Sequence, residues 1–468
     1  MSKYEINELY DHAQGAFHLK NLLTDLGERS VYDAAAQCNR CGYCGTVCPT
    51  YMLTGRETLS ARGRNQFLRM LIEGKVAGAE TAAESFGTCL LCGACSSACY
   101  AKVPTPDLAL EGRRSQTGYG RNFLAGVAVN LLLNNRGFFE FWLKAAFLLK
   151  KLGFAGLADL LGLYDFLGLP ALSAAQGVLD RAPLKFLRDI FNQDPALNPK
   201  GKKTVSWAYF ALCGPNYIFP EVGLASVALL KRFSGEGVFA DNFCCGLIAY
   251  NYGRLTEAKE FAKKNILRFE ELTAAFGNFT VVGDCSSCAA FMKTYEQLFT
   301  DDESWRPRAA AFAGAVKDIL EVIDAEQVTA RDRGAAGRTT YHDSCRACHG
   351  QDIRKEPRAV VKKLAGENFA ELPESDWCCG GAGAYAFTQP ALSRQILDRK
   401  VRNIASIRAA TVVVGATSCL LQINAGLKEK YPSAKAVHYS VFVDGLTNPS
   451  AKAADVNPPK GRFTSPTI

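Results

Sequence analysis

The segment CNRCGYCGTVCP at residues 38–49 decides how the N-terminal part of the chain folds. Its cysteines follow the spacing C-x2-C-x2-C-x3-C, and Pro49 comes directly after the last of them. The segment CLLCGACSSACY at residues 89–100 repeats this spacing, with Tyr100 in place of the proline. Three thiolates in such a segment surround one face of a four-iron cluster, and the fourth ligates the other cluster. The sequence therefore predicts a helical domain with two [4Fe-4S] clusters over residues 1–118.

Because the fourth cysteine of each segment crosses over, the spacing also predicts the two ligand sets. The first cluster is expected at Cys38, Cys41, Cys44 and Cys99. The second cluster is expected at Cys48, Cys89, Cys92 and Cys95. Zinc would instead prefer paired CxxC units separated by a longer knuckle. A helical pattern from Arg62 to Glu73 separates the two segments, so the domain is larger than a minimal ferredoxin.

The chain has 468 residues and 18 cysteines, which suits several domains rather than a small disulfide scaffold. The first ten residues are polar and show no secretory signal, so reduced thiols and a cytoplasmic location are expected. The formal charge of +8 comes without any long run of like charge, which argues against nucleic-acid binding. Each oxidised four-thiolate cluster carries about −2, so three or four clusters would bring the protein close to neutral.

A helical linker without cysteines is expected over residues 119–200. Its most apolar stretch, Phe138 to Leu172, is interrupted by lysines and aspartates, so no membrane-spanning helix is predicted. The stretch is read as buried or partner-facing helices. Peripheral contact with the inner face of a membrane, or with a quinone, is the alternative. An extended tail is expected over residues 447–468.

Residues 201–330 and 331–446 form an internal repeat, because their cysteines recur at matched spacing. Each half contains a Cys-Cys-Gly triplet, at residues 244–246 and 378–380. There are 39 residues between Cys245 and Cys285, and again 39 between Cys379 and Cys419. This equal spacing pairs Cys285 with Cys419 and leaves Gln422 opposite Cys288.

Short apolar runs alternate with helical patterns in both halves, which predicts doubly wound parallel α/β domains. The expected strands are 208–212, 280–282, 338–341 and 411–414. The expected helices are 223–233, 255–272, 289–299, 358–364, 392–407 and 420–430. The cysteines then follow the carboxyl ends of the strands, where open parallel sheets bind ligands.

Two further thiol sets are therefore expected to hold one or two additional [4Fe-4S] clusters. The first set is Cys213, Cys244, Cys245, Cys285 and Cys288. The second set is Cys345, Cys378, Cys379 and Cys419, with Cys348 as an extra cysteine. Five thiols with a vicinal pair suit a non-cubane cluster, or a cubane with a free reactive thiol. Vicinal disulfide chemistry and zinc binding are the alternatives.

The cysteine pattern resembles two related families. The repeated Cys…Cys-Cys-Gly…Cys arrangement is similar to the cysteine-rich (CCG) domains of heterodisulfide reductase subunits. The whole order resembles the iron–sulfur subunit of glycolate oxidase and the lactate-utilisation iron–sulfur protein. The segments that carry the resemblance are CGYCGTVCPTY at 41–51, SARGRNQFLRMLIEG at 60–74, CCGGAGAY at 378–385 and SCLLQINAGL at 418–427. The resemblance implies an electron-transfer subunit beside an FAD-linked 2-hydroxy-acid dehydrogenase or other flavoprotein, with a quinone or small carrier as the second partner.

The full CxxC at residues 285–288 is closer to the heterodisulfide reductase pattern, so catalytic disulfide cleavage at the first set is the alternative function. Cys244, Cys245, Cys288 and His342 are the candidate catalytic residues, and a redox sensor without turnover is a third possibility. GAGAYA at 381–386 fits a nucleotide-binding pattern but does not follow a strand. No flavin or nicotinamide of the chain's own is therefore expected, and its two-electron chemistry would come from a partner.

Overall fold

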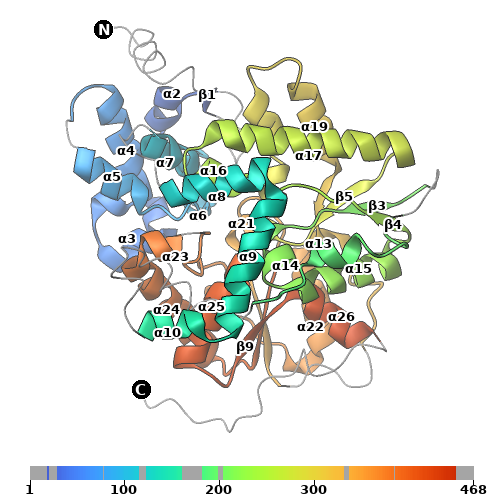
Figure 1. Ribbon diagram of the computed structural model, residues 1–468. Coiled ribbons are helices and arrows are strands. Elements are labelled where there is room, and N and C mark those ends of the chain that lie inside the picture. Colours follow the sequence, from blue (N-terminus) through green and yellow to red (C-terminus); the bar gives the residue numbers. More distant parts are fainter. Residues whose placement is uncertain are drawn as a thin grey trace.

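The computed structural model describes residues 18–19, 29–76, 79–114, 123–160, 182–198, 204–330, 337–383 and 385–448. Figure 1 shows a helical N-terminal part in blue, two α/β parts in green to yellow and in orange to red, and a helical linker. The expected tail begins at residue 447, but Thr447 ends a helix, and residues 449–468 lie outside the described residues.

The N-terminal part is built from short helices joined by the cysteine-bearing loops. After a two-stranded ladder of β1 (His18–Leu19) and β2 (Arg29–Ser30), its helices are α2 (Val31–Ala36), η1 (Tyr43–Val47), α3 (Pro49–Thr54), η2 (Glu57–Leu59), α4 (Ala61–Ile72), α5 (Ala79–Gly87), α6 (Ala94–Ala98) and α7 (Thr105–Arg114). Helix α4 begins because the Ser60 hydroxyl accepts the Gly63 N–H at 2.9 Å, a side-chain N-cap. The predicted helix between the two cysteine segments is confirmed by α4.

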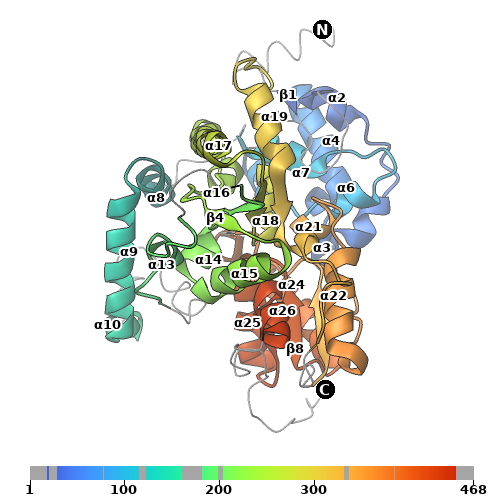
Figure 2. The same ribbon diagram turned by 90° about the vertical axis from the view of Figure 1, so that its right-hand side faces the viewer.

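The linker contributes α8 (Phe123–Asn134), α9 (Arg136–Lys151), α10 (Phe154–Leu160) and α13 (Leu187–Phe191). Asn135 caps α9 by accepting the Phe138 N–H. Figure 2 shows α8, α9 and α10 together along one edge of the molecule, beside α13 and α14. Residues 161–181, for which the sequence also indicates helix, lie outside the described residues.

The first repeat is a parallel sheet of four strands in the order β4-β3-β5-β6. Its strands are β3 (Trp207–Tyr209), β4 (Gly237–Phe239), β5 (Thr280–Gly283) and β6 (Val316–Asp318). Its helices are α14 (Cys213–Tyr217), α15 (Pro220–Phe233), α16 (Leu247–Asn251), α17 (Leu255–Phe276), α18 (Ser286–Met292), η3 (Tyr295–Phe299), α19 (Arg306–Ala315) and α20 (Ile319–Val322).

The second repeat is a parallel sheet in the order β7-β8-β9, and a parallel bridge from Thr339 to Phe369 stands where β4 stands in the first. Its strands are β7 (Thr339–His342), β8 (Thr411–Val414) and β9 (Lys435–His438). Its helices are α21 (Cys345–Cys348), α22 (Lys355–Ala365), η4 (Gly366–Asn368), α23 (Tyr385–Thr388), α24 (Pro390–Ser406), α25 (Thr417–Lys430) and α26 (Tyr439–Thr447).

The predicted alternation of strands and helices is confirmed, with shifted ends and three missed strands. The structure adds β4, β6 and β9, which the sequence analysis did not recognise because each covers only three or four residues. The predicted helix 289–299 is wrong as one element, since α18 ends at Met292 and a separate 3-10 turn follows.

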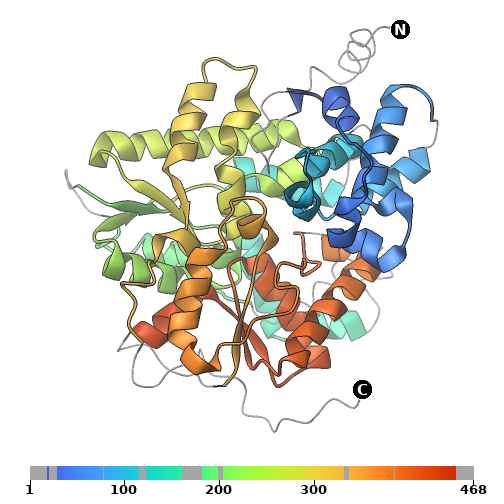
Figure 3. The same ribbon diagram turned by 180° about the vertical axis from the view of Figure 1, so that it is seen from behind.

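The two repeats pack against each other through equivalent helices. Helix α15 contacts α26 and α20 contacts α22, so each repeat offers its second and its last helix to the other. Figure 3 shows the N-terminal part in blue above α24 of the second repeat, and α24 contacts α3. Within the described ranges, no helix has both the length and the apolarity needed to cross a membrane.

Candidate metal centres

The first N-terminal thiol set lies near the surface. Burial, together with the neighbouring Cys38, Cys48 and Cys99, raises the pKa of Cys44 to about 11. Cys99 of the second segment thus lies near Cys44 of the first, as does Cys48. Cys41 is exposed. Gly42 has φ 87° at the start of η1, a left-handed conformation that turns the loop back over its own cysteines.

The second N-terminal thiol set is buried, and the guanidinium group of an arginine is buried beside it. Burial raises the pKa of Cys95 well above its usual value, with contributions from Cys48 and Cys89. The guanidinium of Arg64 is buried beside the same thiols, with Nη1 3.9 Å from Cys48 Sγ. Its other nitrogens donate to Thr50, Ser85 and Thr88. Arg64 thus offsets the negative charge of neighbouring thiolates, a role that the sequence could not distinguish from packing.

The five cysteines of the first repeat converge at the carboxyl end of its sheet. Cys213 Sγ lies 3.4 Å from Cys244 Sγ. Hydrogen bonds to Cys245 and Cys285 raise the pKa of Cys288 well above its usual value, so these three thiols touch. A hydrogen bond from Cys288 lowers the pKa of Cys285 to about 6.

The four expected cysteines of the second repeat converge in the same way. Cys379 Sγ lies 3.5 Å from Cys419 Sγ. A hydrogen bond to Cys378 raises the pKa of Cys345 well above its usual value. The extra Cys348 is buried, and its thiol lies near the carbonyl oxygens of Asp343 and Cys345, so hydrogen bonding accounts for it.

The structure corrects the pairing of the last cysteines. Helix α18 begins at Ser286 and α25 at Thr417, each following its strand in the same register. This register pairs Cys288 with Cys419 and Cys285 with Ala416, so the pairing of Cys288 with Gln422 is wrong. The contacts agree, because Cys288 touches Cys245 as Cys419 touches Cys379. The equal 39-residue spacing misled because the segments joining the triplet to β5 and to β8 differ in length.

His342 is the candidate catalytic residue that lies inside the second thiol set. It is the last residue of β7 and is fully buried. One of its ring nitrogens lies within 4.8 Å of the thiols of Cys379 and Cys419. Burial and the nearby charge of Lys400 lower the pKa of His342 well below its usual value, so the ring is neutral.

Lys400 is a buried cation that the sequence analysis missed. Its ammonium group donates to the carbonyls of Glu374, at 2.6 Å, and Ser375, at 3.2 Å. Burial lowers the pKa of Lys400 to about 8, while Cys379 and Cys378 act in the opposite direction. The lysine lies on α24, far in sequence from the thiols it faces, so no local motif marks it.

The thiol sets follow one another through the molecule. Cys92 of the N-terminal part packs in one buried cluster with Cys378 and Trp377, against which Cys345 also packs. Burial is the main cause that raises the pKa of Cys92, and the neighbouring Cys345 raises it as well. Thr417 of the second repeat lies 3.3 Å from Cys285 Sγ of the first. The second-repeat thiols thus lie next to both the N-terminal and the first-repeat thiols, and Arg114 of α7 also donates directly to the Tyr250 carbonyl of the first repeat.

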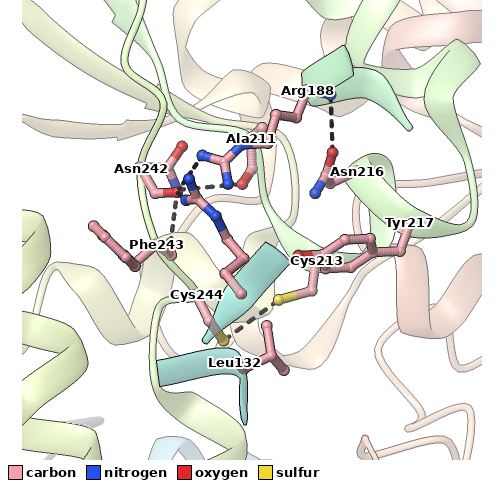
Figure 4. Close-up of a pocket in the computed structure, with 10 residues that line it drawn as sticks. Leu132, Arg188, Ala211, Cys213, Asn216, Tyr217, Asn242, Phe243 and Cys244 are labelled. Carbon is pink, nitrogen blue, oxygen red and sulfur yellow. Dashed lines mark hydrogen bonds between the residues drawn. The ribbon is translucent and has the colours of Figure 1, made fainter. Parts of the chain in front are cut away.

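A small pocket opens beside the first-repeat thiols (Figure 4). Cys213, Cys244, Asn242 and Tyr217 line it together with Leu132 of α8, and two arginines complete it, Arg136 and Arg188. Arg136 donates to the Asn242 carbonyl at 3.1 Å, and so does Arg188 at 3.2 Å. The linker therefore supplies one wall of this pocket, which the sequence analysis did not foresee because the two arginines lie on separate helices.

The donor chemistry fits iron–sulfur clusters. Reduced thiols converge in sets of four or five, and all 18 cysteines are free. Buried cations stand beside two of the sets, as Arg64 and Lys400 show. Four-thiolate sets with charge-offsetting neighbours are the usual environment of [4Fe-4S] clusters.

Comparisons with known proteins agree with this chemistry. The 4Fe-4S dicluster domain family matches residues 34–103, and the cysteine-rich domain family matches twice, at 207–293 and 339–424. Each of the two matches begins six residues before Cys213 or Cys345 and ends five residues after Cys288 or Cys419, in line with the corrected pairing.

Curated relatives cover the chain at moderate identity. A probable glycolate oxidase iron-sulfur subunit of Bacillus subtilis is 28% identical over 90% of this chain and 96% of its own length. Lactate utilization protein A of Exiguobacterium is 33% identical over 49% of this chain and 94% of its own length. The same protein of Oceanobacillus iheyensis is 31% identical over 50% of this chain and 95% of its own length. With its dicluster domain and paired cysteine-rich domains, the chain belongs to the family of the glycolate oxidase iron–sulfur subunit and lactate utilization protein A.

Proposed function

We propose that the protein carries single electrons between an FAD-linked 2-hydroxy-acid dehydrogenase and a quinone or other carrier. The observation that supports this most is that neighbouring thiol sets lie next to one another in space. The N-terminal part contacts the second repeat at Cys92 and Cys378, and the second repeat contacts the first at Thr417 and Cys285. Such a series gives electrons a path with two ends, one near the exposed Cys41 and the other at the pocket beside Cys213.

The residues that would hold the clusters are the four sets described above. Cys38, Cys41, Cys44 and Cys99 would hold one [4Fe-4S] cluster, and Cys48, Cys89, Cys92 and Cys95 the second. The first repeat would bind through Cys213, Cys244, Cys245, Cys285 and Cys288, and the second through Cys345, Cys378, Cys379 and Cys419. Bound clusters of this type accept and release one electron at a time. We expect no flavin or nicotinamide in the purified protein.

The two repeats place their thiols where parallel sheets bind ligands. In the order β4-β3-β5-β6, β3 lies between β4 and β5. The chain therefore continues to one side of β3 with β4 and to the other side with β5, which supports a doubly wound arrangement. Cys213 follows β3 and Cys285 follows β5, so both lie at this change of direction. We propose that residues 1–118, 119–200, 201–330 and 331–446 are the structural units of this electron path.

Rapid mixing tests the proposed function directly. Anaerobically reconstituted protein is mixed with a purified FAD-linked dehydrogenase and its hydroxy acid, and cluster bleaching is followed. We expect bleaching as fast as the dehydrogenase turns over, and re-oxidation by a soluble quinone. A protein that binds iron but is reduced only over hours would rule out the electron-transfer role and favour a redox sensor.

Cleavage of a disulfide is the second candidate function, and the pocket beside Cys213 and Cys244 favours it. Hydrogen bonds from Cys213 and Cys245 lower the pKa of Cys244 well below its usual value, which favours the nucleophilic thiolate. The disulfide would take two electrons and two protons and yield two thiols. The test supplies a reduced viologen and a small organic disulfide. Turnover of the disulfide without any quinone would favour this function.

We also propose that α9 contacts the cytoplasmic face of a membrane. One face of α9 packs inward through Phe139, Leu143 and Phe147. The opposite face exposes Phe141, Trp142, Leu148, Leu149 and Leu152, with Trp142 57% and Phe141 64% exposed.

The charge around this face suits an anionic membrane. Among residues 136–156 the exposed side chains are apolar apart from Lys151, and the acidic Glu140 faces inward, where its carboxylate accepts from Tyr217. Aromatic and leucine side chains with flanking lysines are typical of helices that lie in a membrane interface. Because Arg136 of α9 also lines the thiol pocket, such contact would bring the pocket close to a lipid-soluble quinone.

Sedimentation with vesicles tests this contact. The holoprotein is expected to bind vesicles containing phosphatidylglycerol, and the variant Phe141→Ser/Trp142→Ser/Leu149→Ser to lose at least tenfold in binding. The variant Leu224→Ser/Leu267→Ser, which removes exposed leucines on α15 and α17, is the matched control and should bind like the native protein. Equal binding by native protein and triple variant would contradict the proposed contact.

A further inference from the structure

His342 stands where a ligand of the second-repeat set is expected. It ends strand β7, next to β8, whose chain continues to Cys419. A ring nitrogen of His342 and the thiols of Cys379 and Cys419 all lie within 4.8 Å of one another. All three residues are buried, so the nitrogen faces the thiols without intervening solvent.

A backbone carbonyl fixes which nitrogen of His342 faces the set. Nδ1 lies 3.1 Å from the Ser375 carbonyl oxygen, which can only accept a hydrogen bond, so Nδ1 carries the proton. In the neutral ring Nε2 then has a free lone pair. Nε2 is buried and has no hydrogen-bond partner among the described residues. Metal-binding histidines show this arrangement, with one nitrogen donating to a carbonyl and the other bound to the metal.

The first repeat shows what is missing from the second. In the first repeat, Cys285 touches Cys288, which also touches Cys245. In the second repeat, Ala416 replaces Cys285 and offers no donor, while His342 stands beside the matching thiols, Cys379 and Cys419. At the strand position of His342 the first repeat has Phe210, three residues before Cys213 as His342 is three residues before Cys345. Each repeat therefore has one additional donor beside the same pair of thiols.

We propose that Nε2 of His342 is an iron ligand in the second repeat and replaces the thiolate that Cys285 supplies in the first. This inference rests on the proposed function, because it requires that the second-repeat thiols hold an iron–sulfur cluster. The two repeats would then differ in their ligands, one all-thiolate and the other mixed.

His438 shows that burial alone does not produce this arrangement. It ends β9 and is as buried as His342. Its Nδ1 accepts the Ser440 N–H at 3.2 Å, so the proton lies on Nε2, the opposite tautomer. A protonated nitrogen offers no lone pair to a metal. His438 is therefore a matched control for a buried histidine at a strand end.

A histidine ligand has a consequence for electron transfer. Replacing thiolate ligands by histidine raises the reduction potential, as in Rieske centres compared with plant-type ferredoxins. The second-repeat cluster is expected to accept electrons more readily than an all-thiolate cluster in the same place. Since this repeat lies between the other sets, His342 would favour entry of electrons into the middle of the series.

Pulsed EPR of the full-length holoprotein, labelled with 15N-histidine and poised over a range of potentials, tests the ligand. We expect a histidine-nitrogen coupling of the size seen for iron-bound nitrogen. It should disappear in His342→Phe, which copies Phe210, and persist in His438→Asn. In His342→Cys the coupling should also disappear, while the iron content stays native and one midpoint potential falls.

The measurements distinguish a failure of the proposed histidine ligand from a failure of the proposed function. Native iron content without any strong nitrogen coupling would overturn the histidine ligand and leave the proposed function standing. A coupling that persists in His342→Phe, or one only as weak as a hydrogen-bonded nitrogen gives, would overturn it as well. If Cys379→Ser/Cys419→Ser loses no iron compared with the native protein, the second repeat holds no cluster, and the proposed series itself fails.

Discussion

The two repeats share a fold and differ in chemistry. Both place parallel strands in the same order, carry a Cys-Cys-Gly turn and begin a helix directly after a cysteine-bearing strand end. They differ in single donors at those strand ends, Cys285 against Ala416 and Phe210 against His342. Side chains just beyond the strands can change without disturbing the sheet, because the core depends on the residues within the strands. The repeat thus presents two different sets of side chains on one scaffold.

The repeats also differ in what covers them. The thiols of the second lie against the N-terminal part, where Tyr385 donates to the Thr88 carbonyl at 2.9 Å. Those of the first lie beside the pocket under the linker, and Cys213 and Cys244 are only partly buried. A set enclosed by protein suits electron relay, and a set beside a pocket suits exchange with a partner. The difference in cover therefore indicates the middle and the end of the series.

Exchanging the donor that distinguishes the repeats should give the largest difference between the outcomes expected for the two candidate functions. Cys285→Ala gives the first repeat the residue of the second, while Cys288, the counterpart of Cys419, stays in place. If the protein is a relay, electron flow to a quinone should fall by less than about threefold. If the first repeat cleaves disulfides through the five-thiol set, disulfide turnover should be lost. Steady-state assays with each acceptor measure both quantities.

Ala416→Cys is the reciprocal change and the control for Cys285→Ala. It adds a thiol to the second repeat at a buried helix start, so iron content should stay native. A loss of iron from Ala416→Cys would contradict the expectation that the second repeat tolerates a further thiol at this position.

The sequence predicted the sheet architecture and the thiol sets because both rest on local patterns. A buried strand of four residues, such as Thr411–Val414, is visible as a run of β-branched residues, and the cysteines mark the strand ends. The sequence paired Cys288 with the wrong residue of the second repeat. The pairing was made by counting residues from the triplet, whereas equivalent positions in the fold are set by where the strands and helices begin. Lys400 and Arg188 escaped notice for a different reason. Each acts on residues far away in sequence, and only the tertiary fold brings them together.

The Cys-Cys-Gly turns should differ in their tolerance of a side chain. Gly246 and Gly380 both have φ above 80°, which costs an alanine about 1–2 kcal/mol. A Cβ at Gly380 would lie 2.7 Å from the Ser393 carbonyl oxygen, whereas at Gly246 the nearest atom, the Ala258 oxygen, is 3.2 Å away. We expect Gly380→Ala to destabilise by about 3 kcal/mol and Gly246→Ala by about half of that. Thermal unfolding of the holoproteins measures the difference.

A result in which Gly246→Ala is the more damaging of the two would show that the first repeat packs more tightly around its triplet than the second. Serine at the same positions serves as a check on side-chain size. It has the same Cβ as alanine, so the order of the two sites should not change.

The smallest effect concerns the last strand of each repeat, where Asp318 and His438 occupy equivalent places. Both are buried, and both cap the helix that follows, Asp318 by accepting the Leu320 N–H at 3.1 Å and His438 that of Ser440. Burial raises the pKa of Asp318 from 3.8 to about 7, and it lowers the pKa of His438 from 6.5 to about 4. The same cause thus moves an acid and a base in opposite directions.

The two caps should therefore give stability opposite dependences on pH. The contribution of Asp318 is fully present below pH 3.8 and is lost as the pH rises toward 7. That of His438 is present above pH 6.5 and is lost as the pH falls toward 4. Asparagine keeps a capping oxygen without a titrating group. Relative to the native protein, Asp318→Asn should gain stability between pH 4.5 and 7.5, and His438→Asn should lose its relative stability over the same interval, each by about 2 kcal/mol. Thermal midpoints of the anaerobic holoproteins measured across this interval decide the matter, because parallel slopes in the two variants would show that neither cap titrates within it.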